Sequence, residues 1–435
     1  MVYTNCWQQL NIGVVLLLVS FKCFASAEIF EFGSAKSLQT TKVISEAVPF
    51  NSERGFGFDF DTLGNIRFSQ HGFNAEKTVY FSVRLPEGRY QLDFTIGSDV
   101  VESNTTIKAE SRRLLLNQLV VPQGKTQSHS VVIDVRSPVI NATQQIALND
   151  REKADLNWDN KLTLEFAPQS AIKRIQVSTI DSIPTLYLAG DSTVTDQDVE
   201  PWASWGQLIT QYLNDELVVA NYAVSGASLF SFKAEQRLAK ILSLLKAGDY
   251  VFIQFAHNDE KRKGEGIGPW LSYSDLLREY VNKVRELGGI PVLLTPVQRR
   301  FFQADGRLQE THGDYPAAIR AVAKSMQVAL IDLTQLSTVL YENWGDDRSR
   351  QAFVQYPANT FPNQAKALKD NTHFNYFGAN EIALCVIKGI RDVKLPLRDF
   401  LRADAPAYDP RMPNLAENWT VPMSPRFVAT QPDGS

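Results

Sequence analysis

The fold of this chain is decided by the stretch Thr185-Leu186-Tyr187-Leu188-Ala189-Gly190-Asp191-Ser192-Thr193-Val194. Its first half is apolar and β-prone, and a helical pattern begins at Trp205, so Ser192 follows a strand that leads toward a helix. Open α/β sheets place their chemistry outside the carboxyl ends of the strands. We therefore predict that Ser192 lies in a tight turn at that edge, as a candidate nucleophile that needs a positioned base. The alternative is an ordinary turn in which Ser192 caps a helix.

Strand-like and helix-like segments alternate after residue 184. The alternation predicts right-handed βαβ units and a parallel sheet with helices on both faces, an α/β fold. The expected strands are Thr185–Ala189, Leu217–Asn221, Asp249–Phe255, Ile290–Thr295 and Val328–Leu333. The expected helices are Trp205–Leu213, Lys233–Leu245, Ser274–Leu287, Pro316–Met326 and Ala379 to about Val393.

The preceding residues have a different character. Short β-rich runs between turn clusters predict a β-sandwich domain over residues 28–182. Two of these runs flank Pro86-Glu87-Gly88, which predicts a hairpin. The rings of residues 55–60 are expected in the sandwich core, with a sugar-binding face as the alternative. The catalytic domain is expected over residues 184–400, and residues 401–435 are expected as a tail that is packed on the surface or partly disordered.

The first residues predict a secretory signal peptide over residues 1–27. An apolar run at 12–19 is followed by Ala25-Ser26-Ala27, a small-x-small cleavage pattern that would start the mature chain at Glu28. We expect an exported protein, secreted or periplasmic, with no membrane contact after cleavage; the alternative is an uncleaved N-terminal anchor. Of the three cysteines only Cys385 would remain, in an apolar helical run where a buried thiol is expected.

The composition excludes some classes of partner. The 435 residues are 44% hydrophobic and 21% charged, with a net charge of −4, as in a soluble globular protein. The chain has no excess of positive charge to attract phosphates, so nucleic acid is not an expected partner. No histidine or cysteine cluster has metal-ligand spacing, so we expect no metal and no cofactor. The sequence leaves the oligomeric state open.

Polar residues follow the expected strands and precede the last helix. Gly226 comes after the second strand, Asn258 after the third, and Asp370 and His373 lie in an expected loop before the last helix. Asp370 stands three residues before His373, close enough to orient its imidazole. The N–H groups of Ser192 and Gly226 and the amide of Asn258 are candidate donors to an oxyanion. This set of groups is typical of acyl transfer through a tetrahedral intermediate.

Taken in chain order, four short blocks resemble those of the SGNH (GDSL) hydrolases. They are Gly190-Asp191-Ser192, Gly226, Asn258 and Asp370-Asn371-Thr372-His373. The resemblance implies a flavodoxin-like three-layer α/β/α domain. It also implies Ser192 as nucleophile, His373 as base, Asp370 as its partner, and Ser192, Gly226 and Asn258 as oxyanion-hole donors. One departure is Ala256, because the family usually has glycine at this place.

Further segments resemble the rhamnogalacturonan acetylesterase branch: Ser204-Trp205-Gly206-Gln207, Thr295-Pro296-Val297-Gln298-Arg299-Arg300 and His312-Gly313-Asp314-Tyr315-Pro316. The resemblance implies a serine esterase that removes acetyl groups from an O-acetylated pectic polysaccharide without a cofactor, behind an N-terminal galactose-binding-like β-domain. Two alternatives stay open. One is another SGNH hydrolase acting on acetyl-xylan, another acylated carbohydrate or a lipid ester. The other is a carbohydrate-binding protein with an inactive esterase domain.

Candidate substrate-binding residues lie at the same edge of the sheet. Arg299 and Arg300 follow the fourth strand, and His257 precedes Asn258. An arginine can hold a galacturonate carboxylate through two parallel hydrogen bonds. Lys261, Arg262 and Lys263 lie nearby in sequence. The alternative is that these are solvated loop charges, or that Arg299 bonds Asp332 or a helix terminus.

Overall fold

The computed structural model describes residues 27–34 and 41–433. The predicted signal segment and two of the three cysteines fall on residues 1–26, outside the described residues. Cys385 is a buried free thiol, as predicted. No helix in the described part of the chain is long and apolar enough to cross a membrane.

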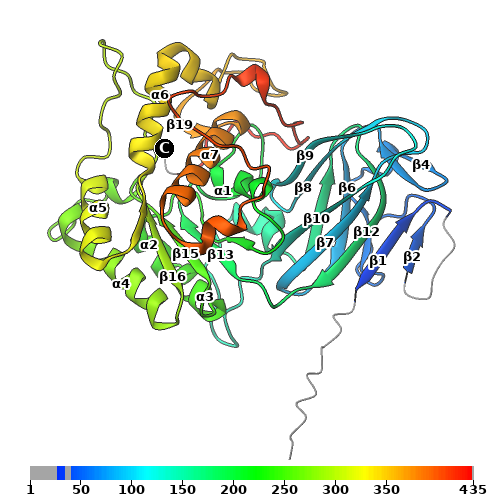
Figure 1. Ribbon diagram of the computed structural model, residues 1–435, viewed down its shortest axis with the longest axis horizontal. Coiled ribbons are helices and arrows are strands. Elements are labelled where there is room, and N and C mark those ends of the chain that lie inside the picture. The colour runs from blue at the N-terminus through cyan, green and yellow to red at the C-terminus, as the bar shows by residue number, and fades with distance from the viewer. Residues whose placement is uncertain (1–26, 35–40, 434–435) are drawn as a thin grey trace, which may run out of the picture.

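A five-stranded parallel sheet forms the centre of the second half of the chain (Figure 1). Its strands stand in the order β14-β13-β15-β16-β17, the flavodoxin-like order, and every neighbouring pair is parallel. The strands are β13 (Thr185–Gly190), β14 (Val218–Asn221), β15 (Tyr250–Gln254), β16 (Ile290–Leu294) and β17 (Ala329–Ile331). The predicted α/β fold is therefore confirmed, and Ser192 lies two residues beyond the end of β13.

Helices cover both faces of this sheet. Leu186 and Leu188 of β13 pack into a core shared with α1, α6 and α7, whereas Tyr187 and Ala189 face a second core shared with α2 to α5. The helices are α1 (Trp205–Leu208), α2 (Leu229–Ala234), α3 (Arg237–Leu244), α4 (Ser274–Glu286), α5 (Tyr315–Met326), α6 (Leu333–Ser349) and α7 (Tyr376–Asp392). The alternation along β13 explains why the strand is apolar on both faces.

Several predicted elements differ in detail. The helix expected over Lys233–Leu245 is interrupted between α2 and α3, where Gln236 takes a left-handed conformation (φ 64°). The 17-residue α6 was not predicted. The segment with Asp370 and His373 was expected as a loop, and this is wrong: both lie on β19 (Leu368–Phe374), which pairs with β18 (Phe353–Tyr356).

The described residues of the range 28–179 (28–34 and 41–179) form two β-sheets that share one apolar core. One sheet has the order β10-β7-β12-β1-β2, with β5 on β12 and β4 on β5. The other has the order β3-β6-β11-β8-β9. The strands are β1 (Glu28–Phe32), β2 (Thr41–Ile44), β3 (Phe56–Asp59), β4 (Ile66–Ser69), β5 (Gly72–Ala75), β6 (Val79–Arg84), β7 (Gly88–Ile96), β8 (Ser103–Ala109), β9 (Arg113–Val121), β10 (Gln127–Val135), β11 (Lys161–Phe166) and β12 (Ala171–Thr179).

The predicted hairpin around Pro86 is wrong. β6 and β7 belong to different sheets, so the turn leads the chain across the sandwich. A turn signal marks a change of direction but does not say which sheet receives the next strand. Among residues 55–60, Phe58 is 1% exposed and contacts four other rings of the core, whereas Phe60 is exposed.

Buried arginines join the sandwich to the loop that follows Ser192. Arg112 forms an ion pair with Glu200 (2.7 Å) and donates to the backbone carbonyls of Gln197 and Trp202. Arg113 pairs with Asp196 at 3.1 Å. Because these side chains are almost fully buried, they fix the loop from outside the α/β region.

The C-terminal tail packs against both halves of the chain. Lys108 of β8 donates to the carbonyl of Pro422 (2.7 Å), and Ser424 donates to Glu165 of β11 (2.7 Å). Further along, the indole N–H of Trp202 donates to the carbonyl of Val428 (3.0 Å). The tail thus runs from the sandwich to the neighbourhood of Ser192.

Candidate active site

Ser192, His373 and Asp370 form a continuous chain of contacts. Nε2 of His373 lies 2.9 Å from Oγ of Ser192, and Nδ1 lies 2.7 Å from Oδ2 of Asp370. The other oxygen, Oδ1 of Asp370, accepts the backbone N–H groups of Thr372 (2.7 Å) and His373 (2.8 Å). The carboxylate therefore fixes the imidazole so that Nδ1–H points to Asp370 and Nε2 can accept the serine proton.

The carboxyl group of Asp370 is held in its ionised form. Burial alone would raise its pKa, but the hydrogen bond and charge of His373, together with the two backbone N–H groups, lower the pKa below its ordinary value. An ionised Asp370 can stabilise the imidazolium that forms when His373 takes a proton.

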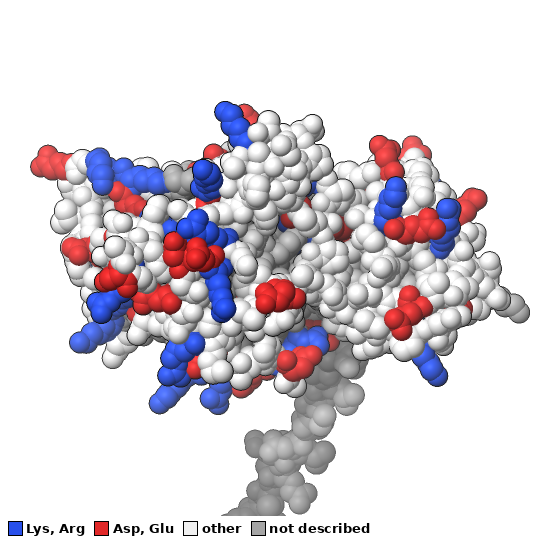
Figure 2. All heavy atoms as spheres, turned by 90° about the horizontal axis from the view of Figure 1, so that it is seen from above, with Lys and Arg blue, Asp and Glu red and all other residues white. Residues whose placement is uncertain are grey.

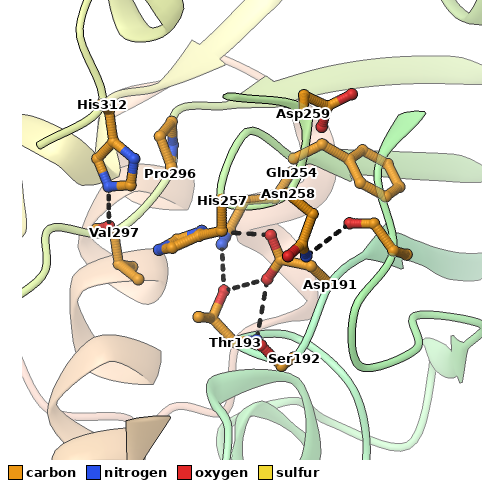
Figure 3. Close-up of polar contacts among 12 residues, drawn as sticks. Asp191, Ser192, Thr193, Gln254, His257, Asn258, Asp259, Pro296, Val297 and His312 are labelled. Carbon is orange, nitrogen blue, oxygen red and sulfur yellow. Dashed lines mark hydrogen bonds and ion pairs between the residues drawn. The ribbon is translucent and has the colours of Figure 1, made fainter. Parts of the chain in front are cut away.

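The turn before Ser192 is held by a buried network around Asp191 (Figure 3). Oδ1 of Asp191 accepts the N–H (3.0 Å) and the hydroxyl (2.8 Å) of Thr193, and Gln254 donates to the same hydroxyl (2.8 Å). Nδ1 of His257 lies 3.2 Å from Oδ2 of Asp191. The serine is thus placed by side chains from β13 and from the end of β15.

His257, predicted to bind substrate, contacts the turn that carries Ser192 in this structure. Its side chain is fully buried, and burial lowers its pKa to about 4. A neutral imidazole therefore donates from Nδ1 to Asp191, which hydrogen bonds from Thr193 help to keep ionised. In this structure His257 positions the turn that carries Ser192.

The three predicted oxyanion donors follow β13, β14 and β15, three adjacent strands of the sheet. Within the described residues, the N–H groups of Ser192 and Gly226 have no protein acceptor. Asn258 donates one amide hydrogen to the carbonyl of Ala227 (3.0 Å), which leaves a second amide hydrogen on the same nitrogen. Ala256 has φ 147°, a conformation that favours glycine, and this explains why the family usually has glycine there.

Comparison with known proteins places this constellation in a family. The sequence profile of the GDSL-like Lipase/Acylhydrolase family matches residues 188–379. The chain is similar to the rhamnogalacturonan acetylesterase RhgT of Bacillus subtilis (strain 168), at 42% identity over 218 residues, which cover 50% of this chain and 93% of that protein. The chain belongs to the GDSL-like lipase/acylhydrolase family. It is a carboxylic ester hydrolase of the SGNH type, similar to the rhamnogalacturonan acetylesterases.

Two further relatives from the same organism extend the comparison. The probable rhamnogalacturonan acetylesterase YesY is 36% identical over 219 residues, which cover 50% of this chain and 96% of that protein. The uncharacterized esterase YxiM is 23% identical over 408 residues, which cover 87% of this chain and 97% of that protein. The similarity to YxiM is therefore longer than the part of this esterase that the family profile matches.

Arg299 and Arg300, predicted to bind a substrate carboxylate, both have carboxylate partners within the chain. Arg299 pairs with Glu260 (2.6 Å), and its side chain is only 10% exposed. Arg300 pairs with Asp346 and donates to Asn371 (3.0 Å). Neither arginine pairs with Asp332, whose partner is Arg320 (2.7 Å). Because existing partners occupy both guanidinium groups, we assign them to the support of the surrounding loops.

The nearby basic residues are also engaged. Arg262 lies 3.9 Å over the ring of Phe230, and Lys263 donates to the carbonyl of Glu260. Lys261 donates to Asn258 at 3.3 Å. The described residues hold no group of three or more His, Cys, Asp or Glu side chains that could hold a metal ion.

A recess of about 200 Å³ lies beside the loop that follows Ser192, and Ser192 itself is not part of its lining. Gln197 lines it and donates to the carbonyl of Ser192 (2.8 Å), and Trp202 lines it with its ring edge-on to His373, 5.9 Å between centroids. Its walls come from Arg136 and residues 149–158, from the loops at 195–202 and 223–225, and from residues 426–433. This esterase therefore builds the surroundings of its serine partly from residues outside the family match.

One contact to Asp370, the acid that orients His373, was not predicted from the sequence. The side-chain amide of Gln431 donates to Oδ2 of Asp370. The two residues are 61 positions apart, and no motif or periodicity marks Gln431. Only the path of the tail brings it to Asp370.

Proposed function

We propose that this esterase removes acetyl groups from an O-acetylated pectic polysaccharide of the rhamnogalacturonan type by way of an acetyl-enzyme. The observation that carries the mechanism is the chain of contacts from Ser192 through His373 to Asp370. The substrate rests on the similarity to proteins named rhamnogalacturonan acetylesterase.

In the proposed first half-reaction, Oγ of Ser192 attacks the acetyl carbonyl carbon while Nε2 of His373 takes the serine proton. The carbonyl oxygen becomes an oxyanion that accepts hydrogen bonds from the N–H groups of Ser192 and Gly226 and from the amide of Asn258. When the tetrahedral intermediate collapses, the bond to the sugar oxygen breaks, and His373 gives its proton to that oxygen. The acetyl group remains on Ser192.

In the second half-reaction a water molecule takes the place of the sugar hydroxyl. His373 accepts a proton from the water as it attacks the acetyl carbon, and the second tetrahedral intermediate releases acetate while Ser192 regains its proton. Asp370 stays ionised throughout and stabilises the imidazolium. The reaction consumes one water for each acetyl group removed and needs no redox step.

The test is acetate release from acetylated rhamnogalacturonan, acetylated xylan and a long-chain fatty acyl ester, compared at equal ester concentration. We expect the highest kcat/KM on the pectic polymer. A clear preference for xylan or for the long-chain ester would instead assign this hydrolase to another acylated carbohydrate or to lipids. The absence of hydrolysis of any of them, including a chromogenic acetate ester, would favour a binding protein with an inactive esterase domain.

A further inference from the structure

The recess reaches the catalytic residues through Gln197, which bonds to Ser192, and Trp202, whose ring meets His373, so it offers a place for a part of the substrate other than its acetyl group. Its volume of about 200 Å³ lies below the roughly 300–1,000 Å³ of pockets that enclose a drug-sized ligand, so it has room for one sugar ring. The indoles of Trp158 and Trp202 contribute to its lining, together with amide, carboxyl and guanidinium groups. A mixture of ring surfaces and convergent polar groups suits the alternating C–H and O–H faces of a sugar.

Three arginines line the recess, and two of them have carboxylate partners. Arg136 pairs with Asp196 (2.9 Å), and Arg426 pairs with Asp198 (2.7 Å). The guanidinium group of Arg151 makes one long contact, 3.5 Å to the carbonyl of Gln431, and has no carboxylate within ion-pair distance in the described part of the chain. Arg151 is also solvent-exposed. A cation at the rim of the recess is therefore available to an anionic ligand.

Asp155 provides a second polar group without a partner. Its carboxyl group lines the recess and makes no hydrogen bond to any described residue. Burial, together with the neighbouring charges of Asp198 and Glu152, raises its pKa to about 8. The raised pKa favours the protonated form, in which this carboxyl group can both donate to and accept from sugar hydroxyls.

We propose that this recess binds a uronic acid residue of the polymer, with Arg151 holding its carboxylate and Asp155 a hydroxyl. The proposal rests on the proposed function, because a pectic chain of that type carries uronic acid residues. Arg151 and Asp155 belong to the segment 149–158, outside residues 188–379. The specificity of this esterase for an acidic polymer is thus set by the β-rich half of the chain, in place of the Arg299 and Arg300 clamp.

The test compares Arg151→Gln with Arg307→Gln, a control that removes one positive charge from a side chain that is 79% exposed in another loop. For each variant the ratio of kcat/KM on acetylated rhamnogalacturonan to kcat/KM on 4-nitrophenyl acetate is measured. We expect the ratio to fall roughly 10- to 100-fold for Arg151→Gln, through KM, as for the loss of a charge-assisted hydrogen bond. The control should keep the wild-type ratio. A ratio for Arg151→Gln equal to that of the control would overturn the proposal.

Direct binding separates this proposal from the proposed function. The ligands are galacturonate-containing oligosaccharides without acetyl groups, both saturated and unsaturated. They are titrated into the Ser192→Ala variant, alone or combined with Arg151→Gln or Asp155→Ala. Calorimetry measures the binding. We expect both second substitutions to weaken binding, and a neutral xylo-oligosaccharide to bind more weakly than the acidic one. Equal binding of acidic and neutral oligosaccharides, or no effect of either substitution, would refute the recess as a uronic acid site, even if the enzyme deacetylates the pectic polymer. Preserved acidic binding without deacetylation of that polymer would refute only the proposed reaction.

Discussion

The side-chain amide of Gln431 donates a hydrogen bond to Oδ2 of Asp370, the same carboxylate oxygen that receives Nδ1–H of His373. The C-terminal tail therefore contacts the Asp370 carboxylate, whose negative charge stabilises the imidazolium form of His373. A donor at this oxygen draws negative charge away from the contact with His373. It also helps to fix the rotation of the carboxylate about its side chain.

The first prediction concerns the effect of this contact on pH dependence. In Gln431→Leu the Asp370 carboxylate loses a donor, so more of its charge faces His373 and the imidazolium becomes more stable. We expect the acid limb of the kcat/KM profile on 4-nitrophenyl acetate to move to higher pH. Gln309→Leu, at an exposed position in another loop, should leave that limb in place. An unmoved acid limb in Gln431→Leu, with reduced thermal stability alone, would mean that Gln431 only anchors the tail.

The second prediction concerns the oxyanion donor on β15's loop. Asn258→Ala removes an amide that can meet the developing charge, and the loss of one such donor costs about 10²–10³ in kcat. Because Asn258 also donates to the carbonyl of Ala227, the folded state is checked by its melting temperature. An increase in KM with unchanged kcat would place Asn258 in substrate binding instead.

The third prediction concerns the buried ion pair between Arg112 and Glu200. Arg112→Met leaves the Glu200 carboxylate buried without its cation, which costs about 3–5 kcal/mol of unfolding free energy. The variant should also lose activity, because Arg112 holds the carbonyls of Gln197 and Trp202 in the loop after Ser192. Urea unfolding measures the first effect and acetate release the second.

The control is the double variant Arg112→Met with Glu200→Gln, which removes both charges. It should regain part of the stability lost in the single variant, since an unpaired buried charge is the main cost. If Glu200→Gln instead lowered the stability of the Arg112→Met variant further, as an independent substitution would, this account of the interface would be contradicted.

The fourth prediction concerns the buried, neutral His257. Its pKa falls from 6.5 to about 4 on folding, so between these values the unfolded chain binds a proton that the native state does not. Native stability therefore decreases as the pH falls from 6.5 toward 4. His257→Gln keeps an amide donor toward Asp191 but has no such titration. The difference in melting temperature between wild type and variant should shrink on acidification, and a difference independent of pH would count against a neutral buried imidazole.

Much of the fold could be predicted from local pattern. The five parallel strands are apolar on both faces and were located within one or two residues, because burial between two helical layers leaves a clear signal in sequence. The segment β19 was not recognised as a strand, since its residues Lys369 to His373 are almost all polar. The helix α6 was missed because Gly345 interrupts it and charged residues fill its last turns.

The candidate site could be predicted only where its residues stand in short motifs. Ser192, Gly226 and Asn258 each follow a strand of the parallel sheet, and Asp370 and His373 lie on β19 of a separate two-stranded sheet, from which His373 reaches Ser192. The residues predicted to bind substrate have partners far away in sequence. Arg299 meets Glu260, Arg300 meets Asp346, and His257 meets Asp191, and such pairings leave no periodic signal.

The central claim is that Ser192 carries the acetyl group between the two half-reactions. The most direct measurement is peptide mapping by mass spectrometry after the esterase has been mixed with excess 4-nitrophenyl acetate and quenched with acid within its first turnovers. We predict one acetyl group on the peptide that contains Ser192, and its loss, together with a fall of several orders of magnitude in turnover, in Ser192→Ala. An acetyl group on another residue that disappears at the rate of turnover, or near-normal acetate release by Ser192→Ala, would contradict the account.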